Sequence, residues 1–124
     1  MKNFTITVIH AAFLRDGEQP TAVARVSTAG LDIFQATEYA YRWTNNIDGS
    51  WSMKIGADAN DDVEVIAPLI EHKGSTYGLR STSVGDVLFV DDGEGFTDYF
   101  KVAGFGFEPC DAIDYVTTTT LETA

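Results

Sequence analysis

The segment from Arg80 to Asp86 contains the most obvious chemistry in this chain. It reads Arg-Ser-Thr-Ser-Val-Gly-Asp, so one guanidinium is followed by the hydroxyl side chains of Ser81, Thr82 and Ser83. A guanidinium binds carboxylates and phosphates through paired hydrogen bonds. One hypothesis is therefore that Arg80, Ser81, Thr82 and Ser83 line a pocket for a small anionic or nucleotide-like ligand, next to the aromatic helix described below.

The same segment also has a structural interpretation. Ser and Thr hydroxyls can cap a short turn, and Gly85 can adopt a backbone angle that other residues avoid. Asp86 can accept hydrogen bonds from the turn amides before the chain enters the next strand. In this interpretation the segment is a corner of the fold, and the sequence leaves both interpretations open.

Acidic residues are concentrated in the last third of the chain. The net charge of the 124 residues is −11, and from Asp86 onward Lys101 is the single basic residue. Such a field repels nucleic acid and anionic membranes and attracts basic surfaces. We predict a partner-binding surface that includes Asp91, Asp92, Glu94 and Asp98; the alternative is that the acids only keep the protein soluble.

Aromatic residues give a second argument for a binding surface. Tyr39, Tyr41 and Trp43 alternate along a predicted helix, where alternate residues diverge by about 200°. They cannot all face one core, so at least one lies at the surface or under another chain. We assign Tyr39 and Trp43 to the partner-binding surface and consider a homodimer possible.

Residues that would commit the chain to catalysis or to a metal are not evident. His10 and His72 are the two histidines, and no nucleophile motif accompanies them. Residues 56–64 resemble the first half of a calcium loop, but Val63 and Leu69 stand where Gly and Glu are required. We predict a solvated acidic loop there, no catalytic residues, no metal site and no cofactor.

The single cysteine, Cys110, excludes an internal disulfide. Its acidic neighbours Glu108, Asp111 and Asp114 should raise the pKa of the thiol. The amino-terminal residues lack the pattern of a signal peptide, and no apolar run is long enough to cross a membrane. We therefore predict a cytoplasmic protein without membrane contact.

Periodicity of the apolar residues predicts strands and one main helix. Asp32 and Gln35 have the spacing of a capping box, and the helix should end before Asn45 and Asn46. Residues 71–78 are predicted to be a polar loop, and Pro109 to end the last long strand. The predicted strands cover residues 4–8, 21–26, 51–55, 63–66, 86–90 and 98–107.

Together these elements predict a single α+β domain over residues 1–124. Its core is a twisted, mostly antiparallel β-sheet of five or six strands with one main α-helix packed on it. We expect residues 112–124 to form a short last strand that then frays.

Three segments resemble small uncharacterised proteins encoded by bacteriophages and mobile elements. They are residues 44–51 (TNNIDGSW), 80–87 (RSTSVGDV) and 102–108 (VAGFGFE), and the resemblance covers roughly residues 31–108. It implies a phage accessory protein in the host bacterial cytoplasm, without catalytic residues to transfer. The strand at residues 84–90 (VGDVLFV) is also similar to one in β-barrel domains of the ASCH/PUA type. Those domains bind RNA or nucleotides, which the negative charge of this chain disfavours.

The leading expectation is a non-enzymatic phage protein that binds a basic surface on a host or phage protein. Inhibition of a host defence protein and mimicry of DNA are special cases, while direct nucleic-acid binding is not expected. The alternative is the small-ligand protein with its pocket near Arg80–Asp86.

Overall fold

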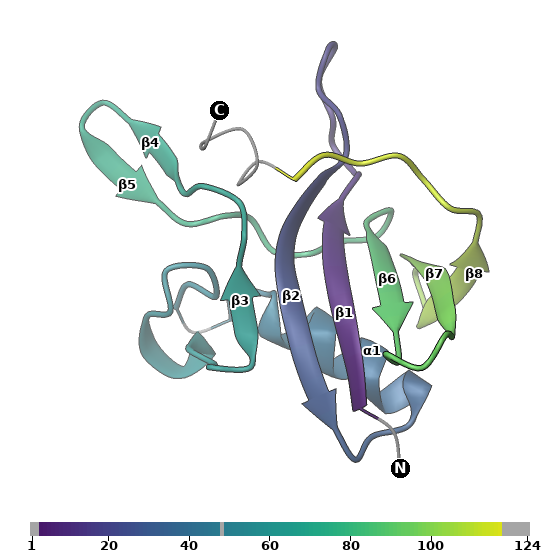
Figure 1. Ribbon diagram of the computed structural model, residues 1–124. Helices are drawn as coiled ribbons and strands as arrows, with labels where there is room; N and C mark the ends of the chain where they lie inside the picture. Colours follow the sequence, from purple (N-terminus) through teal and green to yellow (C-terminus); the bar gives the residue numbers. More distant parts are fainter. Residues whose placement is uncertain (1–2, 48, 118–124) are drawn as a thin grey trace.

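The main feature of the computed structural model, which describes residues 3–47 and 49–117, is a six-stranded antiparallel sheet (Figure 1). The order of its strands is β3-β2-β1-β6-β7-β8. β3 and β8 form its two edges, so the sheet is open rather than a closed barrel. The six strands are β1 (Asn3–His10), β2 (Thr21–Ala29), β3 (Val63–Val65), β6 (Val87–Asp91), β7 (Thr97–Val102) and β8 (Phe107–Cys110).

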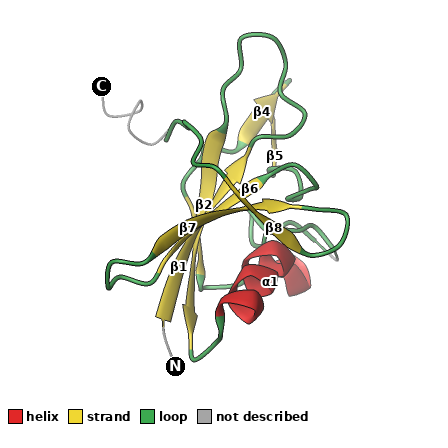
Figure 2. Cartoon of the chain, turned by 90° about the vertical axis from the view of Figure 1, so that its right-hand side faces the viewer, coloured by secondary structure: helices red, strands yellow, loops and turns green. Residues whose placement is uncertain are grey.

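The helix α1 (Ile33–Trp43) packs on one face of this sheet (Figure 2). Its predicted capping box is confirmed: the Asp32 carboxylate accepts a hydrogen bond from the Gln35 amide at 2.8 Å, and the Asp32 amide donates to the Gln35 side chain at 3.1 Å. Ala36 and Ala40 are fully buried. These small side chains let the helix approach the sheet closely.

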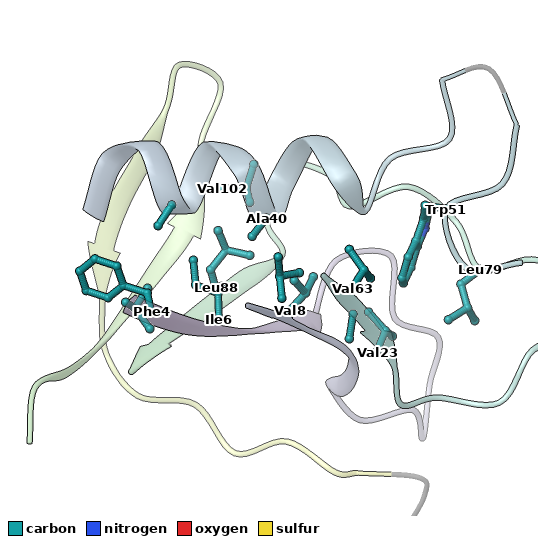
Figure 3. Packing of buried hydrophobic residues seen from close by; sticks show 14 residues of the cluster. Phe4, Ile6, Val8, Val23, Ala40, Trp51, Val63, Leu79, Leu88 and Val102 are labelled. Atoms are coloured by element: carbon teal, nitrogen blue, oxygen red, sulfur yellow. The ribbon is translucent and has the colours of Figure 1, made fainter. Parts of the chain in front are cut away.

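The core lies between α1 and the sheet (Figure 3). Strand pairing places the apolar residues of neighbouring strands side by side in this core. For example, Ile6 of β1 lies between Val26 of β2 and Val90 of β6. Alternate residues point to opposite faces, so the next residue of each strand faces away from α1. On that helix-free face the rings of Phe89 and Tyr99 stack with centroids 4.8 Å apart.

The predicted fold class is confirmed, including one main helix and six strands in one sheet. Three local predictions were wrong. Residues 51–55 form turns closed by a bridge between Ser50 and Ile55, and Lys54 has φ +56°, which an extended strand does not allow. Residues 71–78 are not a loop but most of a hairpin, β4 (Ile70–His72) and β5 (Ser75–Tyr77), separate from the main sheet.

The third error concerns residues 98–107, predicted as one bent strand. The chain turns back after Val102, and the Ala103 amide donates to the Gly106 carbonyl at 3.0 Å. Gly106 has φ +68°, which suits a reversal rather than a bulge. Pro109 therefore lies inside the edge strand β8 instead of ending it, as an edge strand permits.

The carboxy-terminal segment meets the start of β2. Val116 forms a parallel bridge with Thr21, and its amide donates to the Pro20 carbonyl at 2.9 Å. The predicted last strand is thus a single bridge among the described residues, and residues 118–124 lie outside them. The short helix η1 (Gly56–Asp58) completes the described elements.

Candidate functional site

The carboxylate of Asp86 is the centre of the densest polar network in the described structure. Asp86 is fully buried, and its Oδ1 accepts hydrogen bonds from the amides of Ala11 and Ala12 at 2.8 and 2.9 Å. Its Oδ2 accepts one from the Ser83 amide at 2.8 Å. The predicted role of Asp86 as an acceptor for turn amides is confirmed, and the carboxylate also holds the end of β1.

Arg80 completes this network through both of its terminal nitrogens. Nη1 lies 2.7 Å from Oδ2 of Asp86, and Nη2 lies 2.9 Å from Oδ1. The same two nitrogens donate to the carbonyls of Ser81 and Ala12. Because these four contacts use the donors of both terminal nitrogens, only the Nε–H of Arg80 is left for a ligand.

The three hydroxyl residues after Arg80 are also engaged within the fold. Thr82 is buried, with its Oγ1 2.7 Å from that of Thr44 and 3.2 Å from Nε2 of His10. Ser81 accepts a hydrogen bond from the Asn46 amide at 2.8 Å. The Ser83 hydroxyl donates to the Ser81 carbonyl at 3.2 Å. The segment thus ties the end of β1 to the loop after α1.

His10 lies beside this network as a neutral imidazole. The pKa of His10 is lowered from 6.5 to about 4, mainly by burial; the Asp86 carboxylate opposes this shift and the Arg80 guanidinium adds to it. Burial alone would raise the pKa of Asp86. Hydrogen bonds from Arg80 and from the Ala12 amide outweigh burial and hold that pKa below its ordinary value. Both residues therefore resist protonation in the folded state.

A cavity of about 560 Å³ adjoins the network, between the β1–β2 loop and the segment after β5. Its lining includes His10, Arg80 and the strongly exposed Phe13. The Phe13 ring lies 5.2 Å from the Arg80 guanidinium, and Phe13 has φ +58°, an unusual backbone angle for a bulky residue. The cavity does not involve α1, where the sequence placed it, and Ser81, Thr82 and Ser83 do not line it.

The four predicted acidic residues lie around the β6–β7 turn but differ in their surroundings. Asp92 is buried, and its Oδ1 accepts hydrogen bonds from the amides of Glu94 and Phe96 at 2.7 and 3.0 Å. Asp91 is half-buried and accepts from the Gly93 amide. Glu94 is exposed and Asp98 half-buried. The turn therefore uses Asp92 to hold its backbone, and the other three carboxylates face solvent at least in part.

Three carboxylates lie near the register pair of Tyr99 and Cys110 at the β7–β8 edge of the sheet: Asp98 precedes Tyr99 in β7, and Asp111 and Asp114 follow Cys110 at the end of β8. Burial raises the pKa of Tyr99, and Asp114 is among the neighbours that raise it further. Burial also raises the pKa of Cys110; Lys101 opposes this shift, while Asp111 and Asp98 add to it. The predicted direction for the thiol is confirmed. We call this region, defined by Asp98, Asp111 and Asp114, the acidic edge.

Tyr39 and Trp43, which the sequence assigned to the same surface, lie away from the acidic edge. The Tyr39 hydroxyl donates to Asp62 at 2.5 Å, next to the β3 side of the sheet, and its pKa is raised by burial and by that carboxylate. The Trp43 ring lies 6.2 Å from that of Tyr39 and 4.2 Å from the Arg42 guanidinium. Both aromatic side chains are half-buried against the core. The structure therefore does not bring them together with the acidic edge.

A second buried carboxylate, Asp58, escaped the sequence reasoning. It lies in the loop predicted to be solvated, yet it is fully buried. Its Oδ2 accepts hydrogen bonds from the amides of Ile47 and Gly49, and its Oδ1 lies 3.3 Å from Arg42 Nη2. The prediction of solvation was wrong for this residue because an arginine of α1 compensates its charge. Only the alternate spacing of oxygen-bearing side chains at Asp58, Asn60 and Asp62 hinted at a special loop.

The described residues contain no group of three potential ligands that could hold a metal ion. They also contain no helix long and apolar enough to span a membrane. Comparison of the chain with protein-family models, with curated proteins and with solved structures found no match.

Proposed function

We propose that this protein is a non-enzymatic interaction module that binds a basic segment of a partner protein along its acidic edge. The observation that carries the proposal is the position of Asp98, Asp111 and Asp114 beside the Tyr99–Cys110 register pair at one edge of an open sheet. Lys101 is the basic residue that interacts with this region. An edge with this charge attracts lysine and arginine side chains and disfavours phosphate backbones.

The distribution of the basic residues supports this proposal. Two of the arginines, Arg42 and Arg80, are committed to the buried carboxylates Asp58 and Asp86. Arg25 pairs with Glu64 at the opposite edge of the sheet, 3.5 Å away. Each of these pairs cancels one acid with one base, so the net charge of −11 is carried by the remaining residues and attracts a basic partner.

The partner we propose is a host or phage protein in a bacterial cytoplasm, and the module acts by occupying its basic surface. This setting rests on the resemblance of residues 80–87 to phage and mobile-element proteins. A surface that normally binds DNA is basic, so competition with DNA is one form that inhibition would take.

The test is affinity capture from bacterial host lysate with two variants that lose equal charge. The edge variant combines Asp98→Asn, Asp111→Asn and Asp114→Asn. The control variant combines Asp16→Asn, Asp61→Asn and Glu64→Gln, three exposed positions away from the acidic edge. The wild type and the control variant should retain the same protein at low salt, and the edge variant should lose it. Equal retention by both variants would remove the acidic edge as the binding surface.

A second candidate function is supported by the cavity beside Arg80. It combines the exposed ring of Phe13 with the buried His10, which suits a small planar ligand. The saturation of Arg80 by Asp86 weakens the anion-binding version of this hypothesis. Titration of the protein with adenosine and with AMP, followed by amide NMR shifts around Phe13, tests it; a Phe13→Ala variant with unchanged shifts would reject it.

A further inference from the structure

The most exposed aromatic side chain in the described structure stands at the tip of the β7–β8 hairpin. Phe105 is 99 % exposed. It lies in the turn between Ala103 and Gly106, which extends over α1 (Figure 2). A large aromatic ring held in water on a short, closed turn loses the stabilisation that burial would give it. Such a residue is a typical anchor for a partner.

A groove lies between α1 and the turn that carries Phe105, although Phe105 itself does not line it. Its volume is about 320 Å³, and Glu38 and Tyr41 line it from the helix. Gly104, Gly106 and Phe107 line it from the hairpin. Tyr41 and Phe107 form the contact between the two elements, with their rings edge to face at 6.0 Å. A groove at the low end of the usual size range for ligand sites suits one side chain rather than a cofactor.

The chemistry of the groove selects its occupant. The side chains that line the groove are aromatic or small, Glu38 is the one charged residue among them, and the walls are polar as well as apolar. Arg42, one turn after Glu38, is held by Asp58 and does not neutralise the groove. An apolar side chain flanked by a basic residue would satisfy both the walls and the carboxylate.

We propose that the groove between α1 and the β7–β8 turn binds a large apolar residue of the partner, flanked by Lys or Arg, and that Phe105, on the same turn, packs against the bound segment. This inference rests on the proposed function, because it names the kind of segment that the acidic edge would recruit. Glu38 and the acidic edge attract the basic residues, while Tyr41, Phe105 and Phe107 contact the apolar one.

The test uses two defined peptides, Ac-Lys-Arg-Leu-Arg-Lys-NH2 and the same peptide with Ser in place of Leu. Each is titrated into the ¹⁵N-labelled protein at low salt. The Leu peptide should shift the amides of Gly104, Gly106 and Tyr41 and bind about fivefold to tenfold more tightly than the Ser peptide. Phe105→Ala should abolish this difference, and Glu38→Gln should weaken both peptides.

Two controls separate the inference from loss of folding and from failure of the proposed function. Phe105→Ala should keep the wild-type melting temperature, because the ring is fully exposed, and Tyr77→Ala, at another exposed aromatic residue, should keep the preference for Leu. Equal binding of both peptides, with amide shifts around Tyr99 and Cys110 only, would contradict binding of an apolar side chain in the groove. It would leave the proposed function intact. No binding of either peptide, together with no effect of the edge variant in affinity capture, would overturn both.

Discussion

Arg80 and Asp86 form a two-pronged ion pair, with Nη1–Oδ2 at 2.7 Å and Nη2–Oδ1 at 2.9 Å. The pair joins the segment after β5 to the start of β6. Through the amides of Ala11 and Ala12 it also fixes the end of β1. The residues that looked most like a ligand site thus hold three separate parts of the chain together.

Removing one partner of this pair should be costly. Asp86→Ala leaves the guanidinium and the surrounding amides without their acceptor, so we expect a loss of about 3–5 kcal/mol in the free energy of unfolding. Urea unfolding followed by circular dichroism measures it. Asp91→Ala, at a half-buried position in the next turn, is the matched control and should cost less than about 1 kcal/mol. Similar losses for the two variants would mean that the network contributes little.

The same network should make the protein sensitive to acid. His10 has a folded-state pKa of about 4 against 6.5 when unfolded, so the unfolded state binds the proton first as the pH falls. The stability that neutral His10 provides is present above pH 6.5 and is lost between 6.5 and about 4, to a total of about 3 kcal/mol. Asp86, with its lowered pKa, adds a loss at lower pH still.

Unfolding free energies measured at a series of pH values test this dependence. His10→Gln should flatten the curve between pH 6.5 and 4, because glutamine does not titrate in this range. An identical slope in the variant would show that other groups cause the acid sensitivity. The titration of the His10 ring can also be followed directly by NMR.

Asp92 and Glu94 should differ in how much they contribute to the stability of the β6–β7 turn. Asp92→Ala removes the acceptor for two turn amides and should cost about 1–2 kcal/mol. Glu94→Ala removes an exposed side chain and should leave stability within about 0.5 kcal/mol. Thermal unfolding of the two variants distinguishes them, and an equal loss for both would contradict the assigned role of Asp92.

Two glycines should respond oppositely to alanine. A Cβ at Gly49 would overlap the backbone carbonyl of Ile55, whereas a Cβ at Gly104 meets nothing within 4 Å. Gly49→Ala should therefore destabilise the loop after α1 by about 2 kcal/mol or more, while Gly104→Ala leaves the melting temperature nearly unchanged. An unchanged stability of the Gly49→Ala variant would show that this loop can rearrange.

Local patterns predicted most of the fold because each of them has a local cause. The alternation in residues 4–8 and the capping box of Asp32 and Gln35 describe interactions between near neighbours. The turn at Gly106 was missed because glycine in a strand pattern fits a bulge as well as a reversal.

The candidate site was less predictable because its contacts span long sequence separations. Arg42 meets Asp58, and Thr82 meets His10 and Thr44, through tertiary packing that no spacing encodes. The sequence identified the charge surplus correctly but could not show which carboxylates are buried. Asp86 and Asp92 proved to be internal, while Asp111 and Asp114 belong to the acidic edge.

The most direct test of the acidic edge is the salt dependence of binding to the captured partner, measured by calorimetry for the wild type, the edge variant and the control variant. The account predicts that the wild-type Kd rises at least about tenfold between roughly 50 and 300 mM NaCl, since exposed charges are screened over about 10 Å at 0.1 M salt. The control variant should follow the wild type, and the edge variant should bind weakly at every salt concentration. A wild-type Kd that is independent of salt and unchanged in the edge variant would contradict the account.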